Sequence, residues 1–383
     1  MKKINTLLIF VWIVLSSAAA TAQMTDSLTW WDPASNDFPV LEGQGWTNEV
    51  KEPYNRLPAR AEKLVRKPVW SLSRNSTGLI IRFKTNAETL TIKYAVKGRL
   101  NMAHFSTTGV SGLDLYAVNS KGDWSWGPGR YNFGDQPGDT ITYTYSISKD
   151  AGNKNDREYV LYLPIYNTVS WLKIGVPKNT VFEPLPARSQ KPIVIYGTSI
   201  TQGACASRPG MAWPAIVGRR LDHSMINLGF SGNGTLDKEM IELVSEVDAK
   251  MYVLDCLGNM MGRGTFPKEE VKRRVIWAVK YLQSKRPSVP IVLAEFGAFS
   301  DGRLDQSRGE AIDEQNDILK DAFSELQKSG VKNIHLITSK EMNMGMEDTV
   351  DYGHPTDLGL MHYADAFEKI FRTALNLPTG SKK

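Results

Sequence analysis

The sequence is poor in the residues that build metal centres and disulfide scaffolds. Its 383 residues include two cysteines, Cys205 and Cys256, and five scattered histidines. Two cysteines do not form a disulfide scaffold in a chain of this length, and their spacing fits no zinc motif. We therefore expect a protein that folds around a hydrophobic core and needs no metal or organic cofactor. The two cysteines leave two alternatives open, a single disulfide or two buried thiols.

A strong charge bias and a long apolar run are also missing. The formal net charge is +5, and it falls to +3 if Lys2 and Lys3 are removed with an N-terminal segment. This balance is too small and too evenly spread to predict binding to nucleic acid or to an anionic membrane surface. The marked apolar stretch, residues 7–15, is shorter than the roughly 20 residues that a membrane span needs. We therefore expect no membrane insertion.

The N-terminal stretch has instead the pattern of a secretory signal peptide. Lys2 and Lys3 precede the apolar run, and Ala20-Thr21-Ala22 has the small residues of a cleavage site. We predict a signal peptide over residues 1–22 and a mature chain that begins at Gln23 and is periplasmic or secreted. An uncleaved anchor helix is the alternative. The segment contains no cysteine, which argues against processing as a lipoprotein.

The first half of the mature chain carries strand patterns separated by turns. After an irregular lead-in to about residue 60, stretches rich in β-branched and aromatic residues alternate with clusters of Gly, Asn and Asp. The clearest strand candidates are residues 77–85, 89–96, 140–147 and 157–164. No convincing helix pattern lies between them. This favours an antiparallel, jelly-roll-like β-sandwich, which we assign to residues 23–185.

A proline-rich linker precedes a second half in which strand and helix patterns alternate. The strand candidates are residues 192–196, 225–229, 251–256, 290–295 and 333–337. The helix candidates are residues 212–221, 237–245, 268–286, 308–328 and 357–375. Such alternation is typical of a three-layer α/β fold with a doubly wound parallel sheet, and we assign residues 190–378 to it. Ligands of such folds bind at the carboxyl ends of the strands.

Residues suited to acyl transfer follow several of these strands. They are, in chain order, Ser199, Gly232, Asn259, Asp351 and His354. A serine needs a base within reach to accept its proton, and the base needs a carboxylate that fixes its tautomer. We therefore expect Ser199 as nucleophile, His354 as base and Asp351 as the orienting carboxylate. Each residue alone is a common cap or turn residue, so the hypothesis rests on their joint placement at strand ends.

The same set can stabilise the negative oxygen of a tetrahedral intermediate. The candidate oxyanion-hole donors are the backbone N–H groups of Ser199 and Gly232 and the side-chain amide of Asn259. Thr201 stands where the Gly-x-Ser-x-Gly turn of α/β-hydrolases has glycine, so that fold is excluded. The segment also lacks the glycine patterns of dinucleotide-binding and phosphate-binding loops.

With these blocks the second half resembles the SGNH (GDSL-like) hydrolases over residues 190–378. The matching blocks are Gly197-Thr-Ser199, the Gly232 loop, Gly258-Asn259 and Asp351-x-x-His354. Gly-Thr-Ser stands where many members have Gly-Asp-Ser, and Met260 stands where they have aspartate; neither departure removes a catalytic atom. In the first half, Gly112-Leu-Asp-Leu-Tyr116 resembles the GxDLY signature of β-domains that precede such esterases in bacteria, often of the Bacteroides type.

The resemblance implies a serine esterase that removes O-acetyl groups from a plant polysaccharide or another glycan. Two alternatives remain: another serine hydrolase, such as a lipase, thioesterase or arylesterase, or an inactive protein that binds glycans. Candidate substrate contacts are Arg208, Trp213 and His104. Candidate sugar platforms in the β-domain are Trp124, Trp126 and Tyr131. The sequence does not indicate an oligomeric state.

Overall fold

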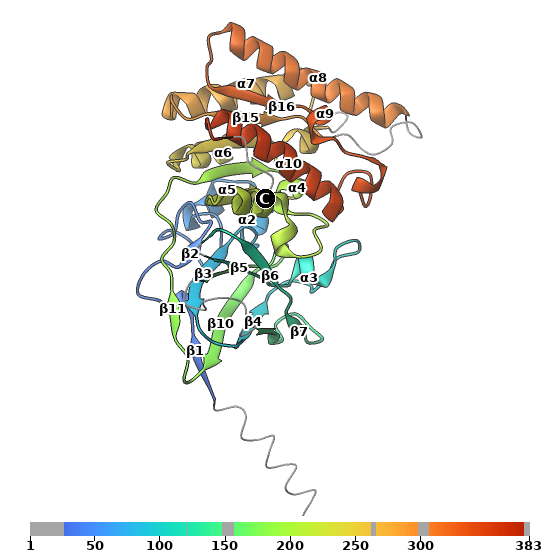
Figure 1. The fold of residues 1–383 in the computed structure, drawn as a ribbon. Coiled ribbons are helices and arrows are strands. Elements are labelled where there is room, and N and C mark those ends of the chain that lie inside the picture. Colours follow the sequence, from blue (N-terminus) through green and yellow to red (C-terminus); the bar gives the residue numbers. More distant parts are fainter. Residues whose placement is uncertain (1–26, 120, 148–156, 262–265, 298–305, 379–383) are drawn as a thin grey trace, which may run out of the picture.

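Two antiparallel sheets organise the first half of the chain and one parallel sheet organises the second half (Figure 1). The computed structural model describes residues 27–119, 121–147, 157–261, 266–297 and 306–378. The predicted signal peptide and its cleavage site lie outside these residues. None of the described helices is long and apolar enough to cross a membrane.

The antiparallel sheets form the sandwich that the sequence predicts. One sheet has the strand order β1 (Leu28–Trp31), β10 (Val169–Pro177), β4 (Thr89–Val96), β8 (Ile141–Ser146) and β7 (Arg130–Asn132). The other has the order β11 (Phe182–Pro184), β3 (Ile80–Thr85), β9 (Glu158–Tyr162), β5 (Asp114–Val118) and β6 (Trp124–Gly127), with β2 (Leu41–Glu42) paired to β3. Along β4, Leu90, Ile92 and Tyr94 alternate into the core between the sheets, as the period of two requires.

The sequence has no convincing helix pattern between its strand candidates, and the structure adds two short helices to this half. Helix α2 (Lys67–Ser73) and the short α3 (Thr107–Val110) interrupt the strands, and 3₁₀ turns span Pro33–Ser35 and Ala59–Lys63. Helix α2 has seven residues, too few to show a helical period. Isolated helices of this length are unstable, so α2 depends on packing. Its Val69 and Trp70 are buried in the core of the parallel-sheet half.

The second half is the predicted α/β fold. Its strand order is β13 (Met225–Gly229), β12 (Ile193–Gly197), β14 (Met251–Asp255), β15 (Ile291–Ala294) and β16 (Ile334–Ile337), all parallel. The main helices are α5 (Trp213–Leu221), α6 (Lys238–Glu246), α7 (Lys268–Lys285), α8 (Gln306–Lys328) and α10 (Asp357–Ala374). Shorter elements are α4 (Ser199–Gln202), α9 (Ser339–Met342) and 3₁₀ turns at Pro209–Met211, Leu257–Met260 and Met346–Asp348. Helices α5 and α10 pack side by side, while α6, α7 and α8 pack in series as the other layer (Figure 1).

The sheet topology positions a site at the carboxyl end of β12. The chain passes from β12 to β13 on one side and then crosses to β14 on the other side. Loops that leave neighbouring strands in opposite directions open a crevice at this switch point, where ligands bind in open α/β sheets. Ser199 is the second residue after β12.

The two halves share a core and buried polar contacts. Trp46 and Leu57, from the predicted irregular lead-in, and Val65 just after it pack with residues of β12 to β14. Arg56 is 1% exposed and donates hydrogen bonds to the carbonyl oxygens of Asn227 (3.0 Å) and Gly229 (2.9 Å) on β13. Because these N-terminal residues complete the second core, the division into residues 23–185 and 190–378 stays a prediction.

Candidate active site

Ser199 is held at the corner between β12 and α4. Thr198 caps α4, and its hydroxyl accepts a hydrogen bond from the Ile200 N–H at 3.3 Å. Gly197 ends the strand, and a Cβ there would lie 2.1 Å from Thr201 Oγ1, so a side chain does not fit. Gly203 ends α4 with φ +109°, a left-handed conformation that favours glycine. The corner thus fixes Ser199, which is 6% exposed.

The structure brings Ser199, His354 and Asp351 together in the predicted order. Ser199 Oγ lies 2.8 Å from His354 Nε2, and His354 Nδ1 lies 2.8 Å from Asp351 Oδ2. Asp351 Oδ1 also accepts a hydrogen bond from the His354 backbone N–H at 2.9 Å, which fixes the loop that carries both residues. With a carboxylate at Nδ1, the imidazole carries its proton there, and Nε2 presents a lone pair to the serine hydroxyl.

Asp351 is suited to remain ionised beside the imidazole. Partial burial raises the pKa of this carboxyl, but the hydrogen bonds from the side chain and backbone of His354 outweigh it, so that the net shift is downward. A carboxylate that stays charged can stabilise the imidazolium that forms when the histidine takes the serine proton.

A second carboxyl lies buried beneath the serine corner. Asp255 ends β14 and accepts a hydrogen bond from Thr201 Oγ1 at 2.6 Å. Burial raises the pKa of Asp255 to about 7, against the opposing effect of the Thr201 hydroxyl. This pair ties α4 to the neighbouring strand.

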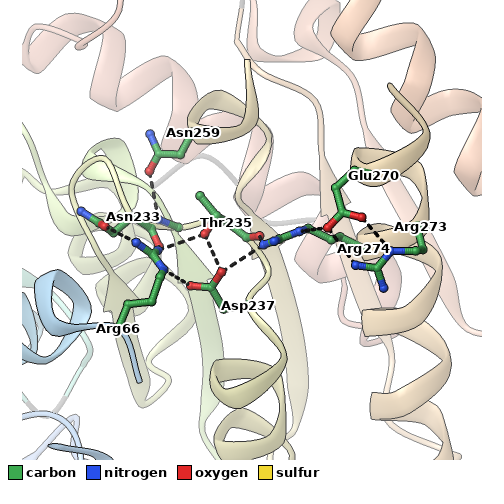
Figure 2. A network of polar contacts seen from close by, with 9 residues as sticks. Arg66, Asn233, Thr235, Asp237, Asn259, Glu270, Arg273 and Arg274 are labelled. Atoms are coloured by element: carbon green, nitrogen blue, oxygen red, sulfur yellow. Dashed lines mark hydrogen bonds and ion pairs between the residues drawn. The ribbon is translucent and has the colours of Figure 1, made fainter. Parts of the chain in front are cut away.

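Three candidate donors lie on the serine corner itself and on the loops that follow β13 and β14, of which the first contacts this corner. The N–H groups of Ser199 and Gly232 have no hydrogen-bond acceptor within the described part of the chain, and neither has the Asn259 side-chain amide group. Gly232 has φ +67° and open space where a Cβ would point. Asn259 Oδ1 accepts a hydrogen bond from the Gly234 N–H at 3.0 Å, which turns its NH₂ group away from that loop (Figure 2). These are the donors that the sequence predicts for an oxyanion hole.

An arginine from the first half holds the loop that carries Gly232 (Figure 2). Arg66 donates to Asn233 Oδ1 and to Asp237 Oδ2, both at 2.8 Å. From the opposite side, Arg274 on α7 donates to Asp237 Oδ1 at 3.0 Å and to the Thr235 carbonyl oxygen at 2.7 Å. Sequence reasoning missed Arg66, because a lone arginine 171 residues away from its partner gives no local signal.

The first half also reaches the Ser-His-Asp group itself. His104 Nε2 lies 3.2 Å from Asp351 Oδ2, and the rings of His104 and His354 have centroids 5.8 Å apart. The Phe105 ring stacks on His104 at 4.6 Å and on Tyr166 at 4.9 Å. The structure therefore places His104, expected as a substrate contact, against the orienting carboxylate.

The GxDLY signature, residues 112–116, forms a contact between the two halves, which we call the dock. Asp114 accepts hydrogen bonds from Trp126 Nε1 (2.6 Å), Arg208 Nη1 (2.5 Å) and the Gly210 N–H (2.9 Å). Burial raises the pKa of Asp114, and the nearby Arg208 charge opposes that rise. Tyr116 accepts a further hydrogen bond from Arg208 at 2.5 Å. The motif thus fixes the segment that follows α4.

The expectations for Arg208 and Trp213 as substrate contacts need correction. Arg208 is bound to Asp114 and stacks over the Trp126 ring at 4.4 Å, so its guanidinium serves the contact between the halves. Trp213 is fully buried and stacks on Phe367 with centroids 4.0 Å apart, which makes it a core residue. Of the aromatic residues proposed as sugar platforms, Trp126 stacks with Arg208 but is still 48% exposed, and Tyr131 is 55% exposed.

The cysteines are free thiols in the structure. Cys256 directly follows β14 and is buried. Cys205 is half-buried, near the Ser-His-Asp group. Among the described residues, a cluster with metal-ligating side chains consists of His104, Cys205 and His354, with ligand atoms within 4.8 Å of one another. Both histidines of this cluster are already engaged by Asp351.

Comparison with known families agrees with this geometry. Residues 190–372 match the GDSL-like lipase/acylhydrolase family, and residues 28–182 match the N-terminal domain of SGNH-hydrolase-type esterases. The GDSL-like match thus covers the second half of the chain, which carries Ser199, Asp351 and His354. A search of curated proteins finds no match.

Solved structures show the same two-part fold. A GDSL-like lipase of Bacteroides ovatus is 29% identical and aligns with TM-score 0.80, over 92% of this chain and 100% of the other. A salicylyl-acyltransferase of a tetracycline biosynthetic pathway is 17% identical with TM-score 0.65, over 93% and 98% of the two chains. A family two carbohydrate esterase from Cellvibrio japonicus is 12% identical with TM-score 0.55, over 91% and 98%. The chain therefore shares its two-part fold with a GDSL-like lipase and with carbohydrate esterases.

Proposed function

We propose that the protein is a serine esterase that removes O-acetyl groups from carbohydrates. The observation that carries the proposal is the 2.8 Å approach of Ser199 Oγ to His354 Nε2, with Asp351 on the opposite ring nitrogen. A serine, an oriented base and a carboxylate at these distances can activate a hydroxyl for attack on a carbonyl carbon. No metal or organic cofactor takes part in this chemistry.

The reaction follows from the positions of these atoms. Ser199 Oγ attacks the acetyl carbonyl carbon while His354 Nε2 takes the hydroxyl proton. The oxygen that becomes negative receives hydrogen bonds from the N–H groups of Ser199 and Gly232 and from the Asn259 amide. His354 then gives its proton to the departing sugar oxygen, which leaves an acetyl-enzyme. Water, deprotonated by His354, attacks this ester and releases acetate.

The carbohydrate part of the proposal is supported by the proteins that share the fold. One is the Cellvibrio japonicus carbohydrate esterase, and another is an acetyl xylan esterase from the rumen bacterium Butyrivibrio proteoclasticus, which is 12% identical with TM-score 0.51 over 91% and 99% of the two chains. No broad apolar lid that would suit long-chain lipids is evident in the sequence around the site. An inactive glycan-binding protein is disfavoured, because none of the reacting groups is missing.

The test is acetate release from acetylated xylan, acetylated pectin and small acetyl esters, with Ser199→Ala as the control. We expect release by the wild type and none above background by the variant. Preference for long-chain acyl esters over every acetylated sugar would assign the protein to the lipases or arylesterases. A folded wild type that releases no acid from any ester would contradict the esterase proposal.

We also propose that the mature protein works outside the cytoplasm, where glycans are encountered. The support is the signal-peptide pattern of residues 1–22. N-terminal sequencing of protein secreted or exported by a bacterial host should begin at Gln23. A chain that keeps residues 1–22 in the cytoplasm would contradict this localisation.

A further inference from the structure

A groove of about 730 Å³ lies on the β-sandwich beside the turn that carries His104. Its walls come from two segments that are neighbours in Figure 1, the approach to α3 and the β7 region. Residues that matter for its chemistry are Arg99, Asn101, Thr107, Tyr131, Phe133 and Asp135. The volume is within the range of roughly 300–1,000 Å³ that is usual for ligand sites.

The groove and the Ser-His-Asp group share one turn of the chain. Asn101 and Ser106 line the groove, and the turn between them is closed by a bridge from Met102 to Phe105. His104, in this turn, contacts Asp351 at 3.2 Å. A ligand that fills the groove therefore lies next to the segment that touches the site of chemistry.

The side chains of the groove suit a ligand that is rich in hydroxyl groups. Tyr131 is 55% exposed, and its ring lies 5.1 Å from that of Phe133, so a flat aromatic face is available. The side chains of Arg99, Asn101, Thr107 and Asp135 make no hydrogen bond or ion pair with another described residue. A sugar ring presents C–H groups to an aromatic face and hydroxyl groups at its edge, and these would meet both kinds of partner.

Charge favours a neutral ligand over an anionic one. Arg99 and Asp135 are the charged residues of the groove, and they carry opposite signs. An acidic polysaccharide or a phosphate-bearing ligand would meet a carboxylate as well as a guanidinium, whereas a neutral sugar can hydrogen-bond to both.

We propose that this groove binds neutral sugar units that flank the acetylated unit, so that the enzyme acts on glycan chains in preference to isolated acetylated sugars. The inference rests on the proposed esterase function and adds the substrate class, a neutral oligosaccharide or polysaccharide. Tyr131 supplies the stacking face, and Asn101 and Asp135 supply hydrogen bonds. The groove takes no part in the chemical step.

The kinetic test compares a long substrate with a short one in Tyr131→Ala. The probes are acetylated xylo-oligosaccharides and 4-nitrophenyl acetate. Loss of one stacking contact should raise KM for the oligosaccharides about 2- to 13-fold. Kinetics on 4-nitrophenyl acetate should not change. The matched control is Trp171→Ala, which removes another exposed aromatic side chain of the sandwich.

A binding experiment separates failure of the groove from failure of the esterase proposal. Ser199→Ala should bind deacetylated xylohexaose in calorimetry, and the double variant Ser199→Ala/Tyr131→Ala should bind it about 2- to 13-fold more weakly. If the wild type shows no esterase activity but the two Ser199→Ala proteins still differ in their affinity for xylohexaose, only the esterase proposal is overturned. An unchanged oligosaccharide KM in Tyr131→Ala, an equal loss on both kinetic probes, or no binding of xylohexaose overturns the groove proposal.

Discussion

The two halves of the chain contribute to the site in different ways. The parallel-sheet half supplies the groups proposed to react, Ser199, Asn259 and the Asp351–His354 loop. The β-sandwich half supplies contacts that hold those groups, with Arg66 on the Gly232 loop and His104 on Asp351. Chemistry and positioning are thus divided between segments that are distant in sequence. The difference predicts that variants of the two halves fail by different routes.

The largest expected effect belongs to the nucleophile in the parallel-sheet half. Ser199→Ala removes the atom that would form the acyl-enzyme, and kcat should fall by about 10⁴-fold or more with the fold intact. The measurement is initial-rate kinetics on 4-nitrophenyl acetate together with circular dichroism. Ser284→Ala, an exposed serine of α7, is the control and should retain full activity. Comparable activity in Ser199→Ala would mean that another residue is the nucleophile.

Asn259→Ala should lower kcat by about 10²–10³-fold and change KM little, because its amide group would act on the developing oxyanion rather than on the bound ester. The substitution also removes the hydrogen-bond acceptor of the Gly234 N–H. The stability of the variant should therefore be measured by urea denaturation alongside the kinetics. A variant with unchanged kcat would remove Asn259 from the oxyanion hole.

Asp114→Ala should lower the stability of the fold and should not remove a group that takes part in the reaction. Without the carboxylate, Arg208 is left partly buried without its counterion, and the free energy of unfolding should fall by about 3 kcal/mol. Urea denaturation measures the free energy of unfolding. The control is Asp248→Ala, which breaks the exposed ion pair between Asp248 and Lys191 and should change that free energy by less than about 1 kcal/mol. If Asp114→Ala were as stable as the wild type, the signature would not be a dock between the halves.

Asp255 predicts a dependence of stability on pH. Its folded-state pKa of about 7 is above the value of about 3.9 in an unfolded chain. The native state therefore holds the proton more tightly, so this contribution is complete below pH 4 and is lost as pH rises through 7. Relative to Asp255→Asn, the wild type should lose about 2 kcal/mol between pH 5 and pH 8 in urea denaturation. Parallel pH profiles of the two proteins would contradict the buried, protonated carboxyl.

The smallest effect belongs to His104, a positioning residue of the β-sandwich half. His104→Ala should lower kcat about 10-fold at constant KM, because Asp351 loses one of the donors that fix it. His104→Gln keeps an N–H donor and should recover most of the loss, which a purely structural role would not predict. Equal kcat values for the wild type and His104→Ala would confine the site to the parallel-sheet half.

Local patterns explain how much of this arrangement the sequence could predict. The strands of the second half are short, continuously buried apolar runs and its helices are amphipathic, so the sequence predicts these elements, and the predicted strand 225–229 has the bounds of β13. Because carboxyl ends of parallel strands meet at one edge, Ser199 and Asn259 could be assigned to one site without coordinates. The docking of Asp114 on Arg208 spans 94 residues and depends on packing between the halves, which no local period encodes. Helix α2 and the contacts of Arg66 depend on the same packing, and so do the positions of Arg208 between the halves and of Trp213 in the core, so none of these roles can be predicted from the local sequence.

The most direct test of the central claim is covalent labelling with a biotinylated fluorophosphonate, followed by peptide mass spectrometry. We expect one adduct on the peptide that contains Ser199, formed by the wild type and strongly reduced in His354→Ala. A folded wild type that takes no label, or takes it on another serine, would contradict Ser199 as the activated nucleophile.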